Sequence, residues 1–73
     1  MGGEKLTDFD MLRAAMEDSG MPTSTIAERS GIERTTFYNR LNGKGEFKAS
    51  EIESLARVLK LTKAKRDAIF FAS

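Results

Sequence analysis

The chain has 73 residues, a formal net charge of +1, no cysteine and no histidine. A chain of this length forms one small domain around one core. The lack of cysteine excludes disulfides, thiolate metal sites and thiol chemistry, and the lack of histidine removes the usual general base and metal ligand. No apolar run approaches the roughly 20 residues that span a bilayer, and no signal peptide is visible. We therefore expect a cytoplasmic protein with no membrane contact, no metal and no cofactor.

The charged residues are distributed unevenly along the chain. Residues 1–30 contain three basic and six acidic side chains and have a formal net charge of −3. Residues 31–73 contain nine basic and five acidic side chains and have a formal net charge of +4. A basic part suits a polyanionic partner, and an acidic part limits indiscriminate binding. Nucleic acid is therefore a candidate partner of the second part.

The first helix is predicted between about residues 8 and 19, where apolar residues recur at spacings of three and four. Thr7 is expected to be its N-cap, Leu6 and Met11 to form a hydrophobic staple, and Gly20 to end it in a left-handed conformation. Its inward face would consist of Phe9, Leu12, Ala15 and Met16.

The next two helices are predicted to be short. Pro22 is tolerated only at a helix start, so the second helix is expected from about Thr23 to Ser30, with Gly31 ending it. The third is expected to begin near Arg34 and to stop at Asn42 and Gly43, both of which suit a left-handed exit.

Two further helices are predicted in the last third of the chain. Ser50 and Glu53 have the spacing of a capping box for the fourth helix, and Thr62 can cap a short fifth helix. The inward residues of the fourth would be Ile52, Leu55, Ala56 and Leu59, and the fifth would carry Ala64, Ala68, Ile69 and Phe71. The predicted fold is a compact all-α domain of five helices over residues 1–73, with residues 1–5 flexible.

Residues 23–42 have the arrangement of a helix-turn-helix, two short helices joined through a turn that contains glycine. Ala27 lies where the helices would cross closely, and Gly31 would supply the backbone conformation of the sharp turn. Ile26, Ile32 and Phe37 would fill the wedge between the two helices.

The chain resembles the lambda-repressor/Cro type of helix-turn-helix domain in the stretch PTSTIAERSGIERTTFYNRLNGKGEFKASEIESLARVLKL. Its LNGK and SEIESLARVL segments and its terminal IFF are similar to short phage-encoded repressor-like proteins. The resemblance covers about residues 9–71 and implies a five-helix DNA-binding domain whose third helix enters the major groove, usually in a dimer. In one departure, Arg40 stands where that family more often has an apolar residue. Leu41 takes that role one residue later, which is expected to shift the tilt of the third helix.

The outward side of the third helix is predicted to read DNA bases. At 100° per residue, an arc of roughly 140° without an acid lies away from Phe37 and Leu41. Arginine can bond to guanine, asparagine to adenine, and threonine to a base edge or a thymine methyl group. Because the start of a recognition helix meets the base edges, we assign this role to Arg34, Thr35, Tyr38 and Asn39. Tyr38 could instead lie half-buried at the edge of the core.

Phosphate contacts are predicted on both sides of the third helix. Thr23 and Ser24 stand at the start of the second helix, where free amides and hydroxyls form an anion site. On the other side, the contacts would come from Asn42, Lys44 and Lys48. The alternatives are helix capping for Thr23 and Ser24, helix termination for Asn42, and ordinary solvated surface for the lysines.

Two charged residues near the arc do not fit this assignment directly. Glu33 would repel phosphate, unless it compensates the helix dipole or holds Arg34 in place. Arg40 is left without a DNA role and can pair with a nearby acid.

A homodimer, at least on DNA, is predicted because one helix-turn-helix unit reads only a few base pairs. The candidate interface is Ile69, Phe70 and Phe71, since three successive helical residues cannot all face one core. One of the two phenylalanines should project outward. The alternative is that the helix frays or that both rings lie under the first helix.

Three functions remain open. The first is a sequence-specific regulator of transcription that binds double-stranded DNA, of the phage or prophage repressor or Cro-like kind, without a small-molecule substrate. The second is a protein-interaction module on the same fold, such as an antirepressor-like protein or an antitoxin component, and the third is a purely structural domain. An enzyme is not expected, because no histidine, cysteine or Walker-type glycine loop is present and acid pairs such as Glu51 and Glu53 do not face each other. The acid-free arc favours the first function.

Overall fold

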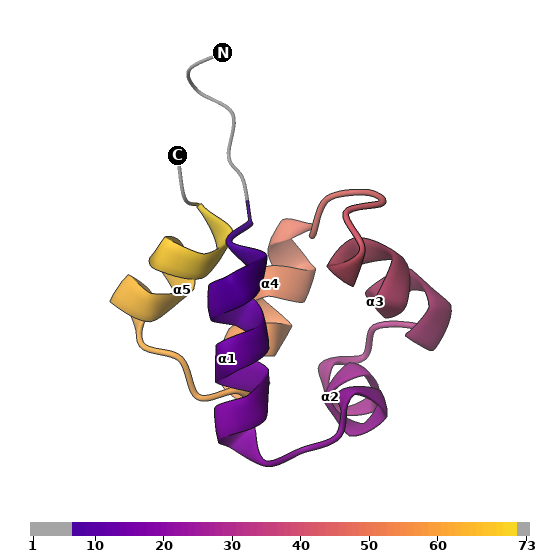
Figure 1. Cartoon of the computed structure of the whole chain (residues 1–73), viewed down its shortest axis with the longest axis horizontal. Coiled ribbons are helices and arrows are strands. Elements are labelled where there is room, and N and C mark those ends of the chain that lie inside the picture. Colours follow the sequence, from indigo (N-terminus) through magenta and orange to yellow (C-terminus); the bar gives the residue numbers. More distant parts are fainter. Residues whose placement is uncertain (1–6, 72–73) are drawn as a thin grey trace.

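The computed structural model describes residues 7–71, so the predictions for residues 1–5 and for the contact of Leu6 lie outside the described residues. Within this range the chain forms five helices and no strand (Figure 1). They are α1 (Phe9–Ser19), α2 (Thr23–Ser30), α3 (Arg34–Leu41), α4 (Ala49–Val58) and α5 (Lys63–Phe70). The predicted all-α class is confirmed. None of the helices described is both long enough and apolar enough to cross a bilayer.

One hydrophobic core is shared by all the helices. In Figure 1, α1 and α4 lie in the middle, with α5 on one side and α2 and α3 on the other. α2 packs against α3 and α4, and α5 packs against α1 and α4. The largest fully buried side chains come one from each helix, in chain order Leu12, Ile26, Phe37, Leu55 and Ile69. Because each helix contributes to the same core, the packing of that core fixes the positions of α2 and α3 relative to the rest of the domain.

The start of α1 differs by one residue from the prediction. Asp8, not Thr7, is the N-cap, and its carboxylate accepts a hydrogen bond from the backbone N–H of Met11 at 3.0 Å. The backbone N–H of Asp8 also donates to the carbonyl of Ile69 at 2.6 Å, which ties this helix start to α5. Both residue types are good caps, so local preference alone does not distinguish them.

The start of α4 also differs from the prediction. The helix begins at Ala49, and the predicted box of Ser50 and Glu53 is wrong. Glu51 accepts a hydrogen bond from the backbone N–H of Lys48, the N-cap residue, at 2.9 Å. A lysine side chain has no acceptor, so only this arm of a capping box exists.

Three of the helices end in the same way, with a left-handed residue followed by a hydrogen bond that spans six residues. The left-handed residues are Gly31 after α2, Gly43 after α3 and Lys60 after α4, with φ of 73°, 82° and 56°. Asn42 has φ of −92°, so the predicted left-handed exit of α3 belongs to Gly43 alone. The N–H of the residue after each left-handed position donates to the carbonyl five residues earlier, at 3.1 Å, 2.8 Å and 2.8 Å.

Lys60 is the unusual member of this set, since a side chain in the left-handed region costs about 1–2 kcal/mol. Lys60→Gly is therefore expected to stabilise the protein by up to about 1 kcal/mol, after the larger unfolded-state entropy of glycine is subtracted. The measurement is the midpoint of urea unfolding. Lys60→Ala, which keeps the backbone penalty, is the control and should show no gain. A midpoint for Lys60→Gly at or below the wild-type value would contradict the prediction.

Candidate nucleic-acid interface

The turn between α2 and α3 has the close packing that the sequence predicts. Ala27 is 1% exposed, and Gly31 adopts the left-handed conformation. Ile26, Ile32 and Phe37 are all buried in the core cluster, in agreement with their predicted place between the two helices. The small side chain and the glycine allow two helices of eight residues each to meet through a three-residue connection.

The outward side of α3 carries the predicted base-reading residues. Phe37 and Leu41 are buried, whereas Arg34, Thr35, Tyr38 and Asn39 lie on the solvent side of the helix. Tyr38 is 41% exposed, which is more than a core residue and agrees with the alternative of a half-buried side chain at the edge of the core. Within residues 7–71, the side chains of these four residues make no hydrogen bond or ion pair to another residue. Their polar groups are therefore directed toward solvent and are free to meet a ligand.

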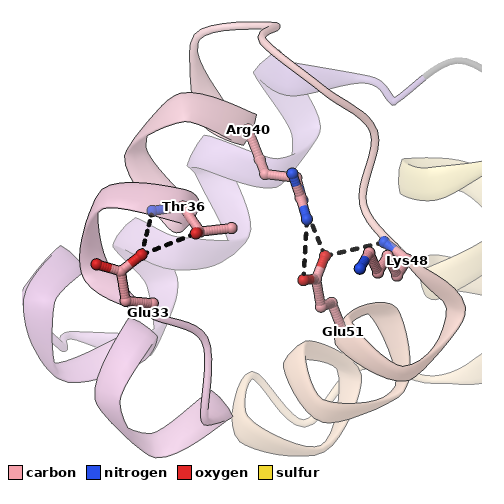
Figure 2. Close-up of polar contacts among 5 residues, drawn as sticks. All are labelled: Glu33, Thr36, Arg40, Lys48 and Glu51. Carbon is pink, nitrogen blue, oxygen red and sulfur yellow. Dashed lines mark hydrogen bonds and ion pairs between the residues drawn. The ribbon is translucent and has the colours of Figure 1, made fainter.

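Glu33 is the N-cap of α3, which explains an acid beside this surface. Its carboxylate accepts hydrogen bonds from the Oγ1 of Thr36 at 2.9 Å and from the backbone N–H of Thr36 at 3.4 Å (Figure 2). The carboxylate therefore compensates the positive end of the helix and does not bind Arg34.

The start of α2 presents free backbone donors. Pro22 is the N-cap and provides no side-chain hydrogen bond, so Thr23 and Ser24 are the first helical residues and neither caps the helix. A hollow of about 400 Å³ is lined by Ser24 and Arg34, together with Ala27, Glu28 and Ile32. Uncapped amides at a helix start attract an anion.

The loop after α3 is exposed except at one anchor. Asn42, Lys44 and Lys48 are exposed, and Asn42 is the C-cap of α3. Phe47 is buried, and its ring makes edge-to-face contacts with Phe37 and Phe70 at centroid separations of 6.2 Å and 5.5 Å. The anchor holds a short loop with two lysines at the C-terminal end of α3.

Arg40 forms an ion pair with Glu51 of α4, as Figure 2 shows. Its Nε and Nη2 donate to the two carboxylate oxygens at 2.9 Å and 3.1 Å, and the two side chains are 14% and 16% exposed. The hydrogen bond from Arg40 holds the pKa of Glu51 below its ordinary value, against the opposing effect of partial burial. Arg40 thus pairs with an acid, the role that its sequence context allows, while Leu41 fills the core position.

The sequence pattern alone does not identify Glu51 as part of this surface. The available signal is its position three residues after Lys48, which is where a carboxylate can reach the N–H of an N-cap residue. Its pairing with Arg40 has no local signal, because eleven residues separate the two.

A comparison with protein families identifies the family to which this pair of helices and its surrounding domain belong. The helix-turn-helix domain family matches residues 10–69, which covers all five helices except the first residue of α1 and the last of α5. The chain belongs to the helix-turn-helix domain family. Comparisons with curated proteins and with solved structures give no match. Membership of the family indicates a DNA-binding regulator.

The last residues of this helix-turn-helix domain divide between core and surface. Ile69 is fully buried and Phe70 is 2% exposed, whereas Phe71 is 37% exposed. The prediction that one phenylalanine projects outward is confirmed. Because Ile69 and Phe70 are needed in the core, only Phe71 of the three residues assigned to an interface is accessible to a partner.

Proposed function

We propose that the protein is a sequence-specific regulator of transcription, of the phage or prophage repressor or Cro-like kind, that places α3 in the major groove of DNA. The observation that carries the proposal is the exposed face of α3, where Arg34, Thr35, Tyr38 and Asn39 have no partner among residues 7–71. Arginine and asparagine are the side chains that form paired hydrogen bonds with guanine and adenine. A helix-turn-helix places such residues at base edges.

The flanking contacts of the proposal are with phosphate. Thr23 and Ser24 would bind one strand through the uncapped start of α2, and Asn42, Lys44 and Lys48 would bind the other strand through the loop after α3. These contacts orient the protein on the duplex, and they carry no sequence information.

Selection of bound sites from random duplexes, at near-physiological salt, tests the function. We expect one motif to be enriched and its binding to weaken steeply as salt rises. A protein-interaction module on this fold would enrich no motif. Binding that is equal for selected and scrambled duplexes would reject the sequence-specific regulator.

Lys44→Ala is expected to lower affinity on every duplex to a similar extent. Each phosphate that a protein neutralises adds about 0.9 to the slope of log affinity against log salt, so removing Lys44 should reduce the slope by about one. The measurement is a salt titration with the selected site and with a scrambled site. Glu46→Ala in the same loop is a control, because it removes an exposed acid and should not reduce the slope. An unchanged slope for Lys44→Ala would remove this loop from the interface.

We further propose that the protein binds as a homodimer through Phe71, with half-sites about 34 Å apart, one turn of DNA. Phe71→Ser is expected to shift the complex on DNA from two chains to one, because a small interface depends on its central aromatic ring. Sedimentation with and without the selected duplex measures this stoichiometry. Ala68→Ser is the control, because Ala68 is an exposed residue of α5, which ends directly before Phe71. Two chains per duplex with Phe71→Ser would place the dimer contact elsewhere.

A further inference from the structure

The ion pair of Arg40 and Glu51 connects α3 with α4 beside the loop that joins them. Arg40 belongs to α3, Glu51 belongs to α4, and the loop with Lys44 and Lys48 runs between these helices (Figure 2). The same carboxylate oxygen that accepts from Arg40 Nε also accepts from the backbone N–H of Lys48, both at 2.9 Å. One carboxylate therefore fixes both the end of the loop and a side chain of α3.

The guanidinium group also lies against the middle of the loop. Gly45 has φ of 96°, and a Cβ atom at this position would be 3.0 Å from Arg40 Nη1. A side chain at residue 45 would require the guanidinium group to shift, and the positive φ of this residue also favours glycine. Arg40 thus lies against the middle of the loop, and Glu51 is hydrogen-bonded to its end.

We propose that Arg40 and Glu51 act as a positioning pair that holds Lys44 and Lys48 toward the DNA backbone while α3 meets the bases. The inference rests on the proposed function. It assigns a role in binding to two residues that need not touch DNA. An ion pair with two parallel hydrogen bonds fixes the relative orientation of its two side chains. Two apolar side chains in contact can shift against each other with little change in energy. With its fork occupied by a carboxylate, Arg40 is also less available as a phosphate ligand in its own right.

Glu51→Gln gives a test in which a positioning role and simple electrostatics predict opposite changes in the affinity for DNA. Removing an acid makes the protein more positive, which by itself strengthens binding to DNA. The glutamine amide, however, has one acceptor oxygen and opposes the second arm of Arg40 with a donor. We expect Glu51→Gln to bind the selected duplex about tenfold more weakly, the effect of removing one charge-assisted hydrogen bond, with a shallower salt slope.

Glu53→Gln is the matched control, since Glu53 is an exposed acid on the same helix. It removes the same charge without disturbing the pair and should leave affinity unchanged or slightly higher. Binding is measured well below the unfolding temperature of every variant, so that loss of fold does not contribute. Arg40→Lys keeps the charge but lacks the fork, and we expect it to bind as weakly as Glu51→Gln.

Acid unfolding shows separately whether the pair forms in solution. Because the folded-state pKa of Glu51 is lowered, the pair stabilises the fold above the ordinary pKa of glutamate, and this stabilisation is lost as pH falls through the lowered pKa. Glu51→Gln should lose that part of the pH dependence and Glu53→Gln should keep it. If the free energy of unfolding falls in the same way with decreasing pH for wild type and Glu51→Gln, the proposal is overturned.

The binding results separate the possible failures. If Glu51→Gln binds as tightly as Glu53→Gln or more tightly, the positioning role is wrong. If in addition Arg40→Lys keeps full affinity, Arg40 contributes at most its charge, which also overturns the proposal. If the wild-type protein enriches no duplex at all, the proposed function itself fails, and this outcome is distinct from both.

Discussion

Phe47→Ala is expected to lower the free energy of unfolding by about 3–5 kcal/mol, the usual cost of truncating a buried aromatic side chain. Phe47 is 8% exposed and joins the rings of Phe37 in α3 and Phe70 in α5. At about 0.05–0.15 kcal/mol per residue, a domain of this size has a total stability of roughly 4–11 kcal/mol. The variant is therefore expected to lose a large part of its stability, and to be largely unfolded if the total lies near the lower end of this range.

Thermal and urea unfolding followed by circular dichroism measure this loss. Phe71→Ala is the matched control, because the same ring is removed from a residue that is 37% exposed, and it should cost clearly less. Similar losses for the two variants would show that Phe47 is not the anchor of the loop after α3.

Arg34→Ala and Asn39→Ala are each expected to weaken binding to the selected site by about 1–3 kcal/mol, the value of a good paired hydrogen bond to a base. Both side chains are exposed on the outward face of α3. Because a base contact carries sequence information, binding to scrambled duplexes should change little. The measurement is a titration of both duplexes at the same salt concentration.

The loss of specificity should also appear at single base pairs. A second site selection with each variant is expected to relax the motif at one position and to leave the others intact. Thr36→Ala is a control within α3, since its hydroxyl is hydrogen-bonded to Glu33. Equal losses on selected and scrambled duplexes would make Arg34 and Asn39 phosphate contacts, and the assignment to base reading would be wrong.

The ends of the helices show where local signals are sufficient. α2 begins and ends at the predicted residues, because Pro22 and Gly31 restrict the backbone directly. The start of α4 differs from its prediction, because Ser50 and Glu53 have the right spacing while a different acid, Glu51, forms the bond. Where two residues offer similar local bonds, contacts with distant parts of the chain decide between them.

The candidate interface is predictable to the extent that it follows helical periodicity. Phe37 and Leu41 are apolar and lie on one side of a helix, so the direction of the opposite side follows from 100° per residue. Periodicity does not identify which of Phe70 and Phe71 faces the core, since both are apolar and adjacent. That choice depends on the space left beside Phe47, which comes from another part of the chain.

The sequence by itself determined the all-α class, the short helices on either side of Gly31 and the polar face of α3, because each follows from backbone preferences and the spacing of apolar residues within a few positions. Only the tertiary structure decided that Arg40 pairs with Glu51, that Phe47 anchors the loop, and that Asp8 bonds to the carbonyl of Ile69. Each of these contacts joins separate elements of the fold. Their geometry depends on how the helices pack around the shared core, which no local pattern specifies.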